Sequence, residues 1–422
     1  MKEYKEKVHE MLTTYKSEGI NLLKRLVNER SVQNHEESVQ AIVIEYLRSL
    51  GLQIDVWEPD INELRAHPAF VSTRETFKGS PNVVGLLRGS GGGRSLILNG
   101  HIDVVPEGDI AWWDSDPYEA VVKDGKVYGR GATDMKGGNV SMLLALKVLK
   151  ELKVSLKGDV IFQSVIEEES GGAGTLSCIL RGYKADGALI PEPTNMKIFP
   201  SQQGSAWFRI KVKGRSAHGG TRYEGVSAIE KAQKVLHHLN RLEKIRNEEI
   251  TSPLYKNVPI PIPINVGKVS GGSWPSSVPD EVVLEGRLGI GPHESIHDAK
   301  KMVETSLLTL SEEDEWFALH PAEVSWFGAH WLPSEVEETH PLIKCLTDAY
   351  SLICKKEPTV EASPWGTDGG LLTNCAKTPA IIFGPGVTEV AHFPNEYIEI
   401  ESVFQTAEII ALTMLDWCGV KE

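Results

Sequence analysis

The residues of this sequence best suited to chemistry are histidines and acids that directly follow short apolar runs. His101 ends the segment "SLILNGH", and Asp103 follows two residues later, although a buried strand normally closes on a turn residue. Three adjacent acids, Glu167, Glu168 and Glu169, likewise follow the apolar segment "VIFQSVI". Three neighbouring charges at such a place need a positive partner to offset their lost hydration. We therefore expect these strand ends to hold something cationic.

Three further candidate ligands lie in separate motifs, Asp134 in "GRGATDMKGG", Glu192 in "IPEPT" and His392 in "AHFPNE". We expect each of them at the carboxyl edge of a sheet, where open α/β sheets bind their ligands. Two imidazoles and several carboxylates, without a thiolate, suit one or two zinc ions, with manganese or cobalt as substitutes. Asp103 is placed to accept a hydrogen bond from the far nitrogen of a metal-bound His101, which would fix its tautomer.

Each of these motifs alone also has a purely structural explanation. A histidine at a strand end is most often a hydrogen-bonded structural residue, and a run of three glutamates is most often solvated surface. The segment "GRGATD" departs from the dinucleotide pattern G-x-G-x-x-G, and the phosphate-loop pattern G-x-x-x-x-G-K-[ST] does not occur. The metal hypothesis therefore depends on the whole set of residues lying together.

Composition restricts the class of protein. A chain of 422 residues favours two domains, and 41% hydrophobic with 24% charged residues is typical of soluble globular proteins. The formal net charge of −14 argues against binding to nucleic acid. The charged N-terminus is no secretory signal, and no apolar run approaches the ~18 residues of a membrane span. Five scattered cysteines indicate reduced thiols, so we predict a cytoplasmic protein.

The elements expected to position the candidate ligands alternate between strand and helix. The segments "NVVGLLRG", "RSLILNGHID", "DVIFQSVI" and "ADGALI" have the length and composition of strands, with helical patterns between them. This alternation predicts an α/β domain with a central mixed, mostly parallel sheet. Asp124-Gly125 indicates a hairpin, and the glycines of "GSGGGR" indicate another hairpin turn.

A second pattern begins after Pro200. Residues 202–333 read as β-α-β-β-α-β, which is the ferredoxin-like order. From Pro341 onward, the α/β pattern resumes. We therefore predict that residues 1–201 and 334–422 form one catalytic, metal-binding domain, into which residues 202–333 are inserted as an α+β domain.

Taken together, the motifs resemble those of the co-catalytic zinc amidohydrolase and peptidase family. This family includes acetylornithine deacetylase, succinyl-diaminopimelate desuccinylase, aminoacylase and carboxypeptidase G. The resemblance covers nearly the whole chain. The motifs "GHIDVVP" and "GRGATDMKGG" are highly specific, "EEESGGAGT" is fairly specific, and "PEPT" and "AHFPNE" are weak alone. The resemblance implies a zinc-peptidase fold with two Zn²⁺, an inserted dimerisation or lid domain, and a homodimer.

The same resemblance implies roles for the ligand residues. Asp134 would bridge the two zinc ions. His101 and Glu192 would complete the shell of one ion, and Glu169 and His392 would complete the shell of the other.

The resemblance also implies a general base and contacts from the inserted domain. Glu168 would be the base, and Glu167 stands where the family commonly has aspartate. His218 in "KGRSAHGG" would be a catalytic residue that reaches the active site of the partner subunit. Arg287 in "EGRLGI" matches a substrate-facing arginine, whose guanidinium suits a carboxylate.

Three further stretches bear on substrate binding. Gly384 and Gly386 in "FGPG" resemble the family's substrate loop, where bare backbone can approach a ligand. The segment "SWPSSVPD" departs from the family, since asparagine is frequent where Ser276 and Ser277 stand, which puts a contact from this loop in doubt. Asp368 in "GTDGG" matches a stretch near the site and is expected to act behind the ligands.

These observations predict an enzyme that removes an N-acyl group from an amino acid, most like acetylornithine deacetylase. An activated water would attack the amide, with Glu168 moving the proton. A desuccinylase, dipeptidase or carboxypeptidase of the same family would use the same ligands on an N-acylated amino acid or dipeptide. A non-catalytic binding protein on the same fold is the remaining alternative, and binding to nucleic acid or membrane is not expected.

Overall fold

The computed structural model describes residues 2–421, which divide into two compact units. Unit 1 comprises Met1–Ser201, Glu335–Ser363 and Thr367–Glu422, and unit 2 comprises Gln202–Ser334 and Pro364–Gly366. None of the helices within residues 2–421 combines the length and apolar character needed to span a membrane.

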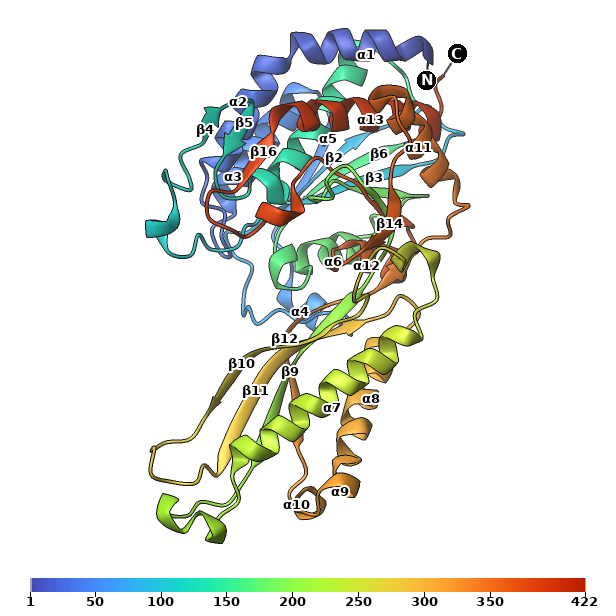
Figure 1. The fold of residues 1–422 in the computed structure, drawn as a ribbon. Helices are drawn as coiled ribbons and strands as arrows, with labels where there is room; N and C mark the ends of the chain where they lie inside the picture. The colour runs from blue at the N-terminus through green and yellow to red at the C-terminus, as the bar shows by residue number, and fades with distance from the viewer. Residues whose placement is uncertain (1, 422) are drawn as a thin grey trace. The chain divides into compact units, whose positions relative to one another are not determined.

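Unit 1 is built on a nine-stranded mixed sheet, and Figure 1 shows helices on both of its faces. Its strand order is β1-β2-β6-β3-β7-β15-β8-β13, with β14 paired to β8. The strands are β1 (Gln53–Trp57), β2 (Asn82–Leu87), β3 (Leu96–His101), β6 (Val160–Val165), β7 (Ala188–Ile190), β8 (Ile198–Gln202), β13 (Ser334–Glu335), β14 (Val360–Ser363) and β15 (Ala380–Ile382).

The predicted mostly parallel character holds for the centre of this sheet. The neighbouring strands β6, β3, β7 and β15 are parallel, whereas β1 pairs antiparallel with β2, β2 with β6, and β8 with β15. The prediction that "GSGGGR" forms a hairpin turn is wrong, because β6 lies between β2 and β3 in the sheet. The glycines instead allow close approach, since a Cβ on Gly93 would lie 2.0 Å from the carbonyl oxygen of Cys418.

The helices of unit 1 lie in two layers. In Figure 1, α5 and α13 lie over one face of the sheet, and α6 and α12 lie over the other. Nearly every side chain of α5 is buried, and the Ser141 hydroxyl donates to the Val403 carbonyl of α13 at 2.9 Å. The helices are α1 (Lys2–Thr14), α2 (Lys16–Val27), α3 (Glu37–Ser49), α4 (Ile61–Arg65), α5 (Gly137–Glu151), α6 (Ala173–Leu180), α11 (Pro341–Cys354), α12 (Gly369–Cys375) and α13 (Ile400–Cys418).

A small three-stranded sheet, with the order β16-β5-β4, joins two distant parts of unit 1. The predicted hairpin is present, because Asp124 and Gly125 both have positive φ between β4 and β5. The third strand comes from the C-terminal part of the chain, with Tyr397 opposite Tyr128. Its strands are β4 (Val121–Lys123), β5 (Lys126–Tyr128) and β16 (Tyr397–Glu399).

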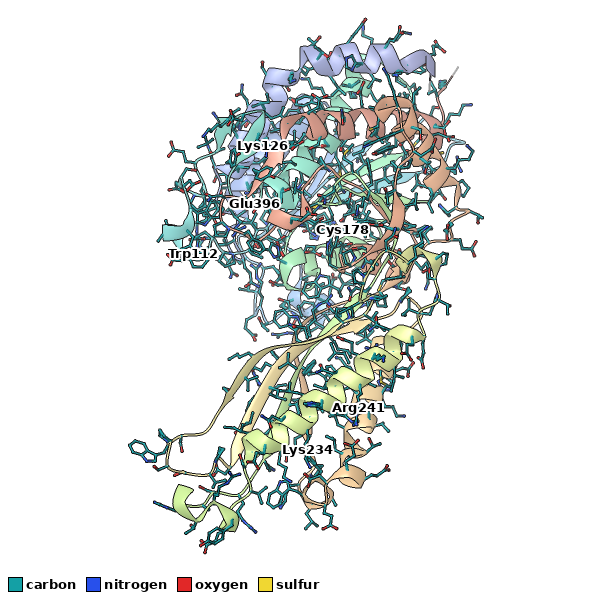
Figure 2. The ribbon with its side chains drawn as sticks, viewed as in Figure 1. Trp112, Lys126, Cys178, Lys234, Arg241 and Glu396 are labelled. Atoms are coloured by element: carbon teal, nitrogen blue, oxygen red, sulfur yellow. The ribbon has the colours of Figure 1, made fainter. Side chains whose placement is uncertain are left out.

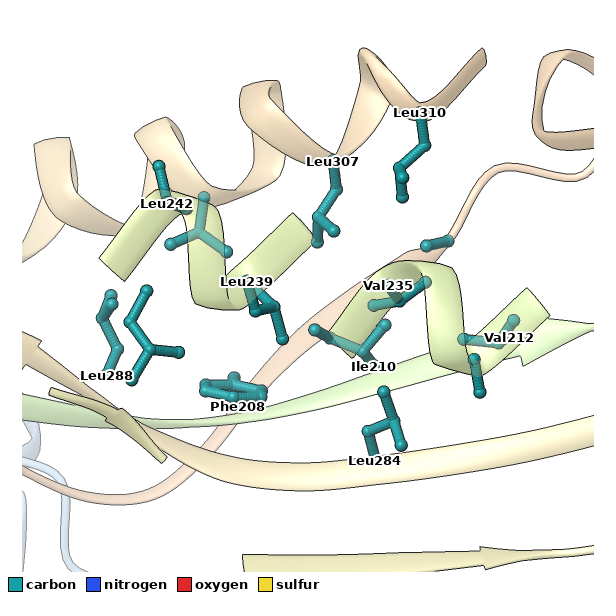
Figure 3. Packing of buried hydrophobic residues seen from close by; sticks show 14 of the residues in the cluster. Phe208, Ile210, Val212, Val235, Leu239, Leu242, Leu284, Leu288, Leu307 and Leu310 are labelled. Carbon is teal, nitrogen blue, oxygen red and sulfur yellow. The ribbon is translucent and has the colours of Figure 1, made fainter. Parts of the chain in front are cut away.

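Unit 2 has the predicted order β-α-β-β-α-β, folded as a four-stranded antiparallel sheet β10-β11-β9-β12. Figure 3 shows Phe208, Ile210 and Val212 of β9 pointing into a core with Leu239 of α7 and Leu307 of α8. The period-two pattern of β9 thus buries one face of the strand. The main elements are β9 (Gly204–Lys213), α7 (Ala228–Glu248), β10 (Ile264–Gly271), β11 (Glu281–Ile290), α8 (Ile296–Leu308), α9 (Leu310–Glu313), α10 (Trp316–Leu319) and β12 (Glu323–Trp331).

Candidate active site

Parallel strands of unit 1 bring most of the candidate ligands to one edge of the sheet. His101 is the last residue of β3 and pairs with Val165, the last residue of β6. Glu169 follows β6 in a short 3-10 turn, and Glu192 lies two residues beyond β7. Because β6, β3 and β7 are parallel neighbours, their carboxyl ends meet, as expected for the ligand-binding edge of an α/β sheet.

Asp134 lies at the centre of the five candidate ligands. Its Oδ1 is 3.0 Å from Nε2 of His101, and its Oδ2 is 3.2 Å from Nε2 of His392. Nε2 of His101 lies 3.7 Å from Oε2 of Glu192, and Nε2 of His392 lies 3.1 Å from Oε1 of Glu169. One carboxylate oxygen of Asp134 therefore faces each histidine, and each histidine has a second carboxylate beside it.

This donor set fits a pair of divalent cations. Donor atoms of His101, Asp134 and Glu169 all lie within 4.8 Å of one another. Imidazole nitrogen and carboxylate oxygen are the donors found in catalytic zinc sites, and a carboxylate with one oxygen facing each side can bridge two ions. The same side chains serve zinc, manganese and cobalt, so they do not select among these metals.

The electrostatics of the cluster also call for positive charge. Burial raises the pKa of Glu192 to about 7. Burial opposes the protonation of His101, but the Glu192 charge and the hydrogen bond to Asp134 hold its pKa well above the usual value. Burial likewise opposes the protonation of His392, but hydrogen bonds to Asp134 and Glu169 raise its pKa to about 11. Without cations the two imidazoles therefore carry the positive charge that balances the acids.

Glu168 lies beside this cluster on a turn that is held from one side by Asp103. The backbone N–H groups of Glu168 and Glu169 donate to the Asp103 carboxylate at 3.3 and 3.2 Å. The Glu168 side chain is 7% exposed, and burial raises its pKa well above the usual value. A buried carboxyl group with a raised pKa can hold a proton near neutral pH, as a general base that later acts as an acid must.

Glu167 holds the same turn from the other side. Its backbone is left-handed, with φ of +61°, and its fully buried carboxylate accepts hydrogen bonds from Gln33 and Ser72 at 2.6 and 2.7 Å. Only the last two of the three adjacent acids therefore turn toward the metal ligands. No pattern in the sequence indicates the contribution of Gln33 or Ser72.

The predicted hydrogen bond between His101 and Asp103 is made by the main chain of Asp103. Nδ1 of His101 lies 2.9 Å from the main-chain carbonyl oxygen of Asp103 and 3.7 Å from its carboxylate. Asp103 therefore accepts from the far nitrogen of His101, as predicted, and the accepting atom is its main-chain carbonyl oxygen. The carboxylate is instead engaged by the backbone of the Glu168 turn, and a carbonyl acceptor fixes the same tautomer.

Gly384 and Gly386 allow the loop after β15 to approach the two segments that carry Glu192 and Asp134. A Cβ on Gly384 would lie 2.3 Å from the carbonyl oxygen of Glu192, and one on Gly386 would lie 2.5 Å from that of Thr133. These glycines therefore support the segments that bear Glu192 and Asp134 through close backbone packing. Their contact with substrate stays a prediction.

His218 and Arg287 belong to unit 2, so the structure groups them apart from the metal ligands. His218 is exposed, and its Nδ1 accepts the N–H of Gly220 at 3.1 Å. The loop that departs from the family holds this turn, because the Ser276 carbonyl accepts from Gly219 at 2.7 Å and Ser277 forms a β-bridge with His218.

Arg287 lies on β11 with a mostly buried guanidinium. Its Nη1 donates to Oε1 of Gln203 at 3.2 Å, and no ion pair joins it to an acid within residues 2–421. Burial lowers its pKa to about 10, which still leaves it charged at neutral pH. A buried guanidinium paired only with a neutral amide is suited to receiving an anionic group.

Two buried groups behind the ligands complete the site. Asp368, expected behind the ligands, is buried and accepts the Thr175 hydroxyl at 2.7 Å. Glu396 and Arg130 form a buried ion pair at 2.7 Å, which was not predicted although both lie in the motifs that carry His392 and Asp134. Their charges next to ligand residues are the signal that could have identified them.

Comparisons with known proteins bear on this geometry. The model for peptidase family M20/M25/M40 matches residues 97–416. The chain is 33% identical to an N-formyl-4-amino-5-aminomethyl-2-methylpyrimidine deformylase from Bacillus subtilis, over 97% of this chain and 96% of the relative. It is 28% identical to an acetylornithine deacetylase from Pectobacterium carotovorum, over 81% of this chain and 85% of the relative. The expectation that acetylornithine deacetylase is most similar is therefore corrected, since the deformylase matches more of the chain at higher identity.

The fold also matches a solved structure. The YXEP protein of Bacillus subtilis, described as a dinuclear metal-binding peptidase of the M20 family, superposes with a TM-score of 0.66 at 17% identity. The match covers 96% of this chain and 99% of that protein. Both units therefore have counterparts in one known structure, and the fold class predicted from the sequence is confirmed.

Proposed function

The chain belongs to peptidase family M20/M25/M40, and on that premise we propose that it hydrolyses a linear amide bond using two divalent cations. The observation that carries the proposal is the position of Asp134, with one carboxylate oxygen facing His101 and the other facing His392. The proposed ions are zinc, with cobalt or manganese as substitutes. Bound there, they would polarise the substrate carbonyl and lower the pKa of a water molecule.

Glu168 is the proposed general base. It takes the proton from the attacking water and delivers it to the leaving nitrogen, so that one carboxyl group serves both halves of the reaction. Its burial supports this role, because a carboxyl group with a raised pKa retains the proton long enough to pass it on. Asp103 and Glu167 act indirectly by holding the turn that carries Glu168.

His218 is the proposed donor to the oxyanion that forms on the amide carbonyl. Because its Nδ1 accepts the N–H of Gly220, the proton of a neutral ring lies on Nε2. The exposed ring thus presents a donor, as oxyanion stabilisation requires. Following the family resemblance, we assign this donor to the active site of the partner subunit in a homodimer that works in the cytoplasm.

The first substrate to test is N-formyl-4-amino-5-aminomethyl-2-methylpyrimidine. Identity of 33% along nearly the full length of both chains supports deformylation of a small aminomethylpyrimidine. Removal of a formyl group uses the same chemistry as removal of an acetyl group, so the metal site serves both equally.

A second candidate is an N-acyl amino acid, such as acetylornithine, or a dipeptide. The partly buried Arg287, which has no acidic partner among residues 2–421, favours a substrate with a carboxylate. The formylpyrimidine carries no carboxylate, so only the second candidate would use this arginine to bind its substrate.

A substrate panel separates the candidates. Purified enzyme loaded with zinc is assayed on the N-formylpyrimidine, on N-acetyl and N-succinyl amino acids, and on dipeptides. We expect the highest kcat/KM for the N-formylpyrimidine, and a preference of tenfold or more for any carboxylate substrate would replace it with the second candidate.

The Glu168→Ala variant tests the mechanism on whichever substrate is turned over. It should retain both metals and lose on the order of 10³-fold in kcat. Unchanged turnover with both metals bound would rule out Glu168 as the base.

A further inference from the structure

Two loops, 258 residues apart in sequence at Asp134 and His392, meet at a single buried ion pair. Nη1 of Arg130 donates to Oε2 of Glu396 at 2.7 Å, and both side chains are at most 2% exposed. The pair belongs to unit 1, and neither residue is a candidate metal ligand. Two fully buried charges are costly unless their geometry is fixed by further hydrogen bonds.

Glu396 provides such bonds to the loop that carries the bridging carboxylate. Its Oε1 accepts the backbone N–H groups of Thr133 and Asp134 at 2.9 and 3.1 Å. Each oxygen of Glu396 therefore has a separate task, one toward the Asp134 loop and one toward Arg130. The backbone of Asp134 is fixed through its own amide, which limits where its carboxylate can lie.

Arg130 provides matching bonds to the loop that carries His392. Its Nη2 donates to the carbonyl oxygens of His392 and Pro106 at 3.4 and 3.3 Å, and its Nη1 reaches that of Phe393 at 3.5 Å. His392 has a left-handed backbone with φ of +66°. Residues other than glycine adopt this conformation when their surroundings hold them there. The forked guanidinium contacts the carbonyl oxygens of the two peptide groups that follow His392.

The ladder between β5 and β16 explains why the pair forms here. Tyr397 of β16 pairs with Tyr128 of β5, and the Gly129 N–H continues the ladder by donating to the Glu396 carbonyl at 2.9 Å. Figure 2 shows Lys126 near one end of this ladder and Glu396 near the other. The end with Glu396 is the one from which both ligand loops depart.

We infer that Arg130 and Glu396 are a positioning pair that fixes the distance between Asp134 and His392, and thereby sets the affinity of the cation those two residues share. The inference rests on the proposed function, because it requires the five ligands to bind two ions. It assigns the pair no contact with substrate. It predicts that loss of the pair lowers the affinities of the two cations unequally. The ion near His392 depends on both segments that the pair holds, whereas His101 and Glu192 are held by the strand ends.

The test is a cobalt titration of the metal-free full-length protein, followed by the visible absorption of Co²⁺ and by calorimetry. The variants are Glu396→Gln, which removes the charge, and Arg130→Lys, which keeps the charge but loses the fork. Glu396→Asp, which keeps the charge on a shorter side chain, should restore part of the affinity. Glu408→Gln is the matched control. Glu408 is also a buried acid of unit 1, and it lies on α13 with its carboxylate 3.0 Å from Nδ1 of His9.

We expect wild-type protein and Glu408→Gln to bind two Co²⁺ per chain. In Glu396→Gln and Arg130→Lys, the affinity of the site that His392→Ala also weakens should fall about 10- to 100-fold, while the affinity of the other site changes less than threefold. The titration should then resemble that of His392→Ala, with a changed absorption spectrum for the second ion. Thermal unfolding of each metal-free variant shows whether it is folded, and Arg130→Lys keeps the test valid if Glu396→Gln does not fold.

Two results would overturn the inference and leave the proposed function standing. One is unchanged Co²⁺ affinity at both sites in folded Glu396→Gln and Arg130→Lys. The other is an equal loss of affinity at both sites that Glu408→Gln shows as well. Failure of the wild-type protein itself to bind two Co²⁺ would instead refute the proposed function, and the inference with it.

Discussion

Binding of cations to the metal-free protein should release protons, and the number released follows from the two histidines. Interactions with Asp134 and Glu169 raise the pKa of His392 to about 11, and the pKa of His101 also lies well above its usual value. Both imidazoles are therefore protonated at pH 7 when no cation is present. A histidine ligand must be neutral and a carboxylate ligand ionised, so loading the site displaces about two protons from the histidines and a further fraction of one from Glu192, whose pKa is about 7.

The sign and size of the pH dependence follow directly. A histidine whose pKa is raised stabilises the metal-free fold fully below about pH 6.5, and this contribution is lost as the pH rises toward about 11 for His392. Raising the pH therefore favours the deprotonated histidines, so that protons compete less with the cations for these ligands. Each displaced proton raises the affinity about tenfold per pH unit, so two protons raise the product of the two binding constants about 100-fold between pH 7 and 8.

Calorimetry measures this release. Zinc is titrated into metal-free protein in two buffers that differ in their heat of ionisation, at pH 7 and at pH 8, and the difference in heat gives the protons released. His392→Ala should release about one proton fewer than wild type, and Glu408→Gln should match wild type. Release near zero, with binding constants equal at the two pH values, would refute the assignment of these histidines as protonated ligands.

Three variants test other parts of the account. Gly384→Ala should destabilise the protein by about 1–3 kcal/mol and weaken metal binding, because its Cβ would lie 2.3 Å from the Glu192 carbonyl; unaltered thermal unfolding and metal content would contradict the packing argument. His218→Ala should lower kcat about 100-fold with both metals retained, and mixing it with Glu168→Ala should restore partial activity; absence of rescue in mixed dimers would contradict sharing across subunits. Arg287→Ala should raise KM at least tenfold for N-acyl amino acids and leave the N-formylpyrimidine nearly unchanged; an equal effect on both substrates would remove the carboxylate assignment.

The sequence predicted the main elements of the fold because their patterns are local. The apolar runs of β2, β3, β6 and β7 and the period-two pattern of β9 are visible without knowledge of their neighbours. The glycine-rich loop after β2 was misassigned for the opposite reason. Whether two strands are joined by a hairpin depends on which strand lies between them, and β6 comes from some 70 residues further along the chain.

The ligands were predicted from the combination of residue type and position at strand ends. His101, Glu169 and Glu192 could be placed in this way, because parallel strands bring their carboxyl ends together. His392 was a candidate from its motif, but its pairing with Glu169 came only from the resemblance, since it lies in a loop whose position depends on the short strand β16. Arg130 and Glu396 act through backbone groups, so their only signal in the sequence is their charge within the motifs that carry Asp134 and His392.

The hydrogen-bond network around Glu168 was the least predictable part of the site. Asp103 was expected to accept a hydrogen bond from His101, and it does so through its carbonyl, but its carboxylate also binds two backbone N–H groups of the Glu168 turn, which was not predicted. A main-chain donor is available at every residue, so the sequence alone cannot indicate which one an acid will bind. The left-handed backbone of Glu167 is also not indicated by the sequence, because the residues that hold its side chain by hydrogen bonds, Gln33 and Ser72, are distant in the chain.

Removal and return of zinc tests the central claim most directly. Protein stripped with a chelator is titrated with zinc while hydrolysis of the best substrate and bound metal are measured on the same samples. The account predicts that hydrolysis disappears on stripping and returns as two zinc ions bind per chain. In Asp134→Ala, addition of zinc should restore neither hydrolysis nor the binding of two ions. Hydrolysis that persists in fully metal-free protein, or a wild-type chain that binds no divalent cation, would contradict it.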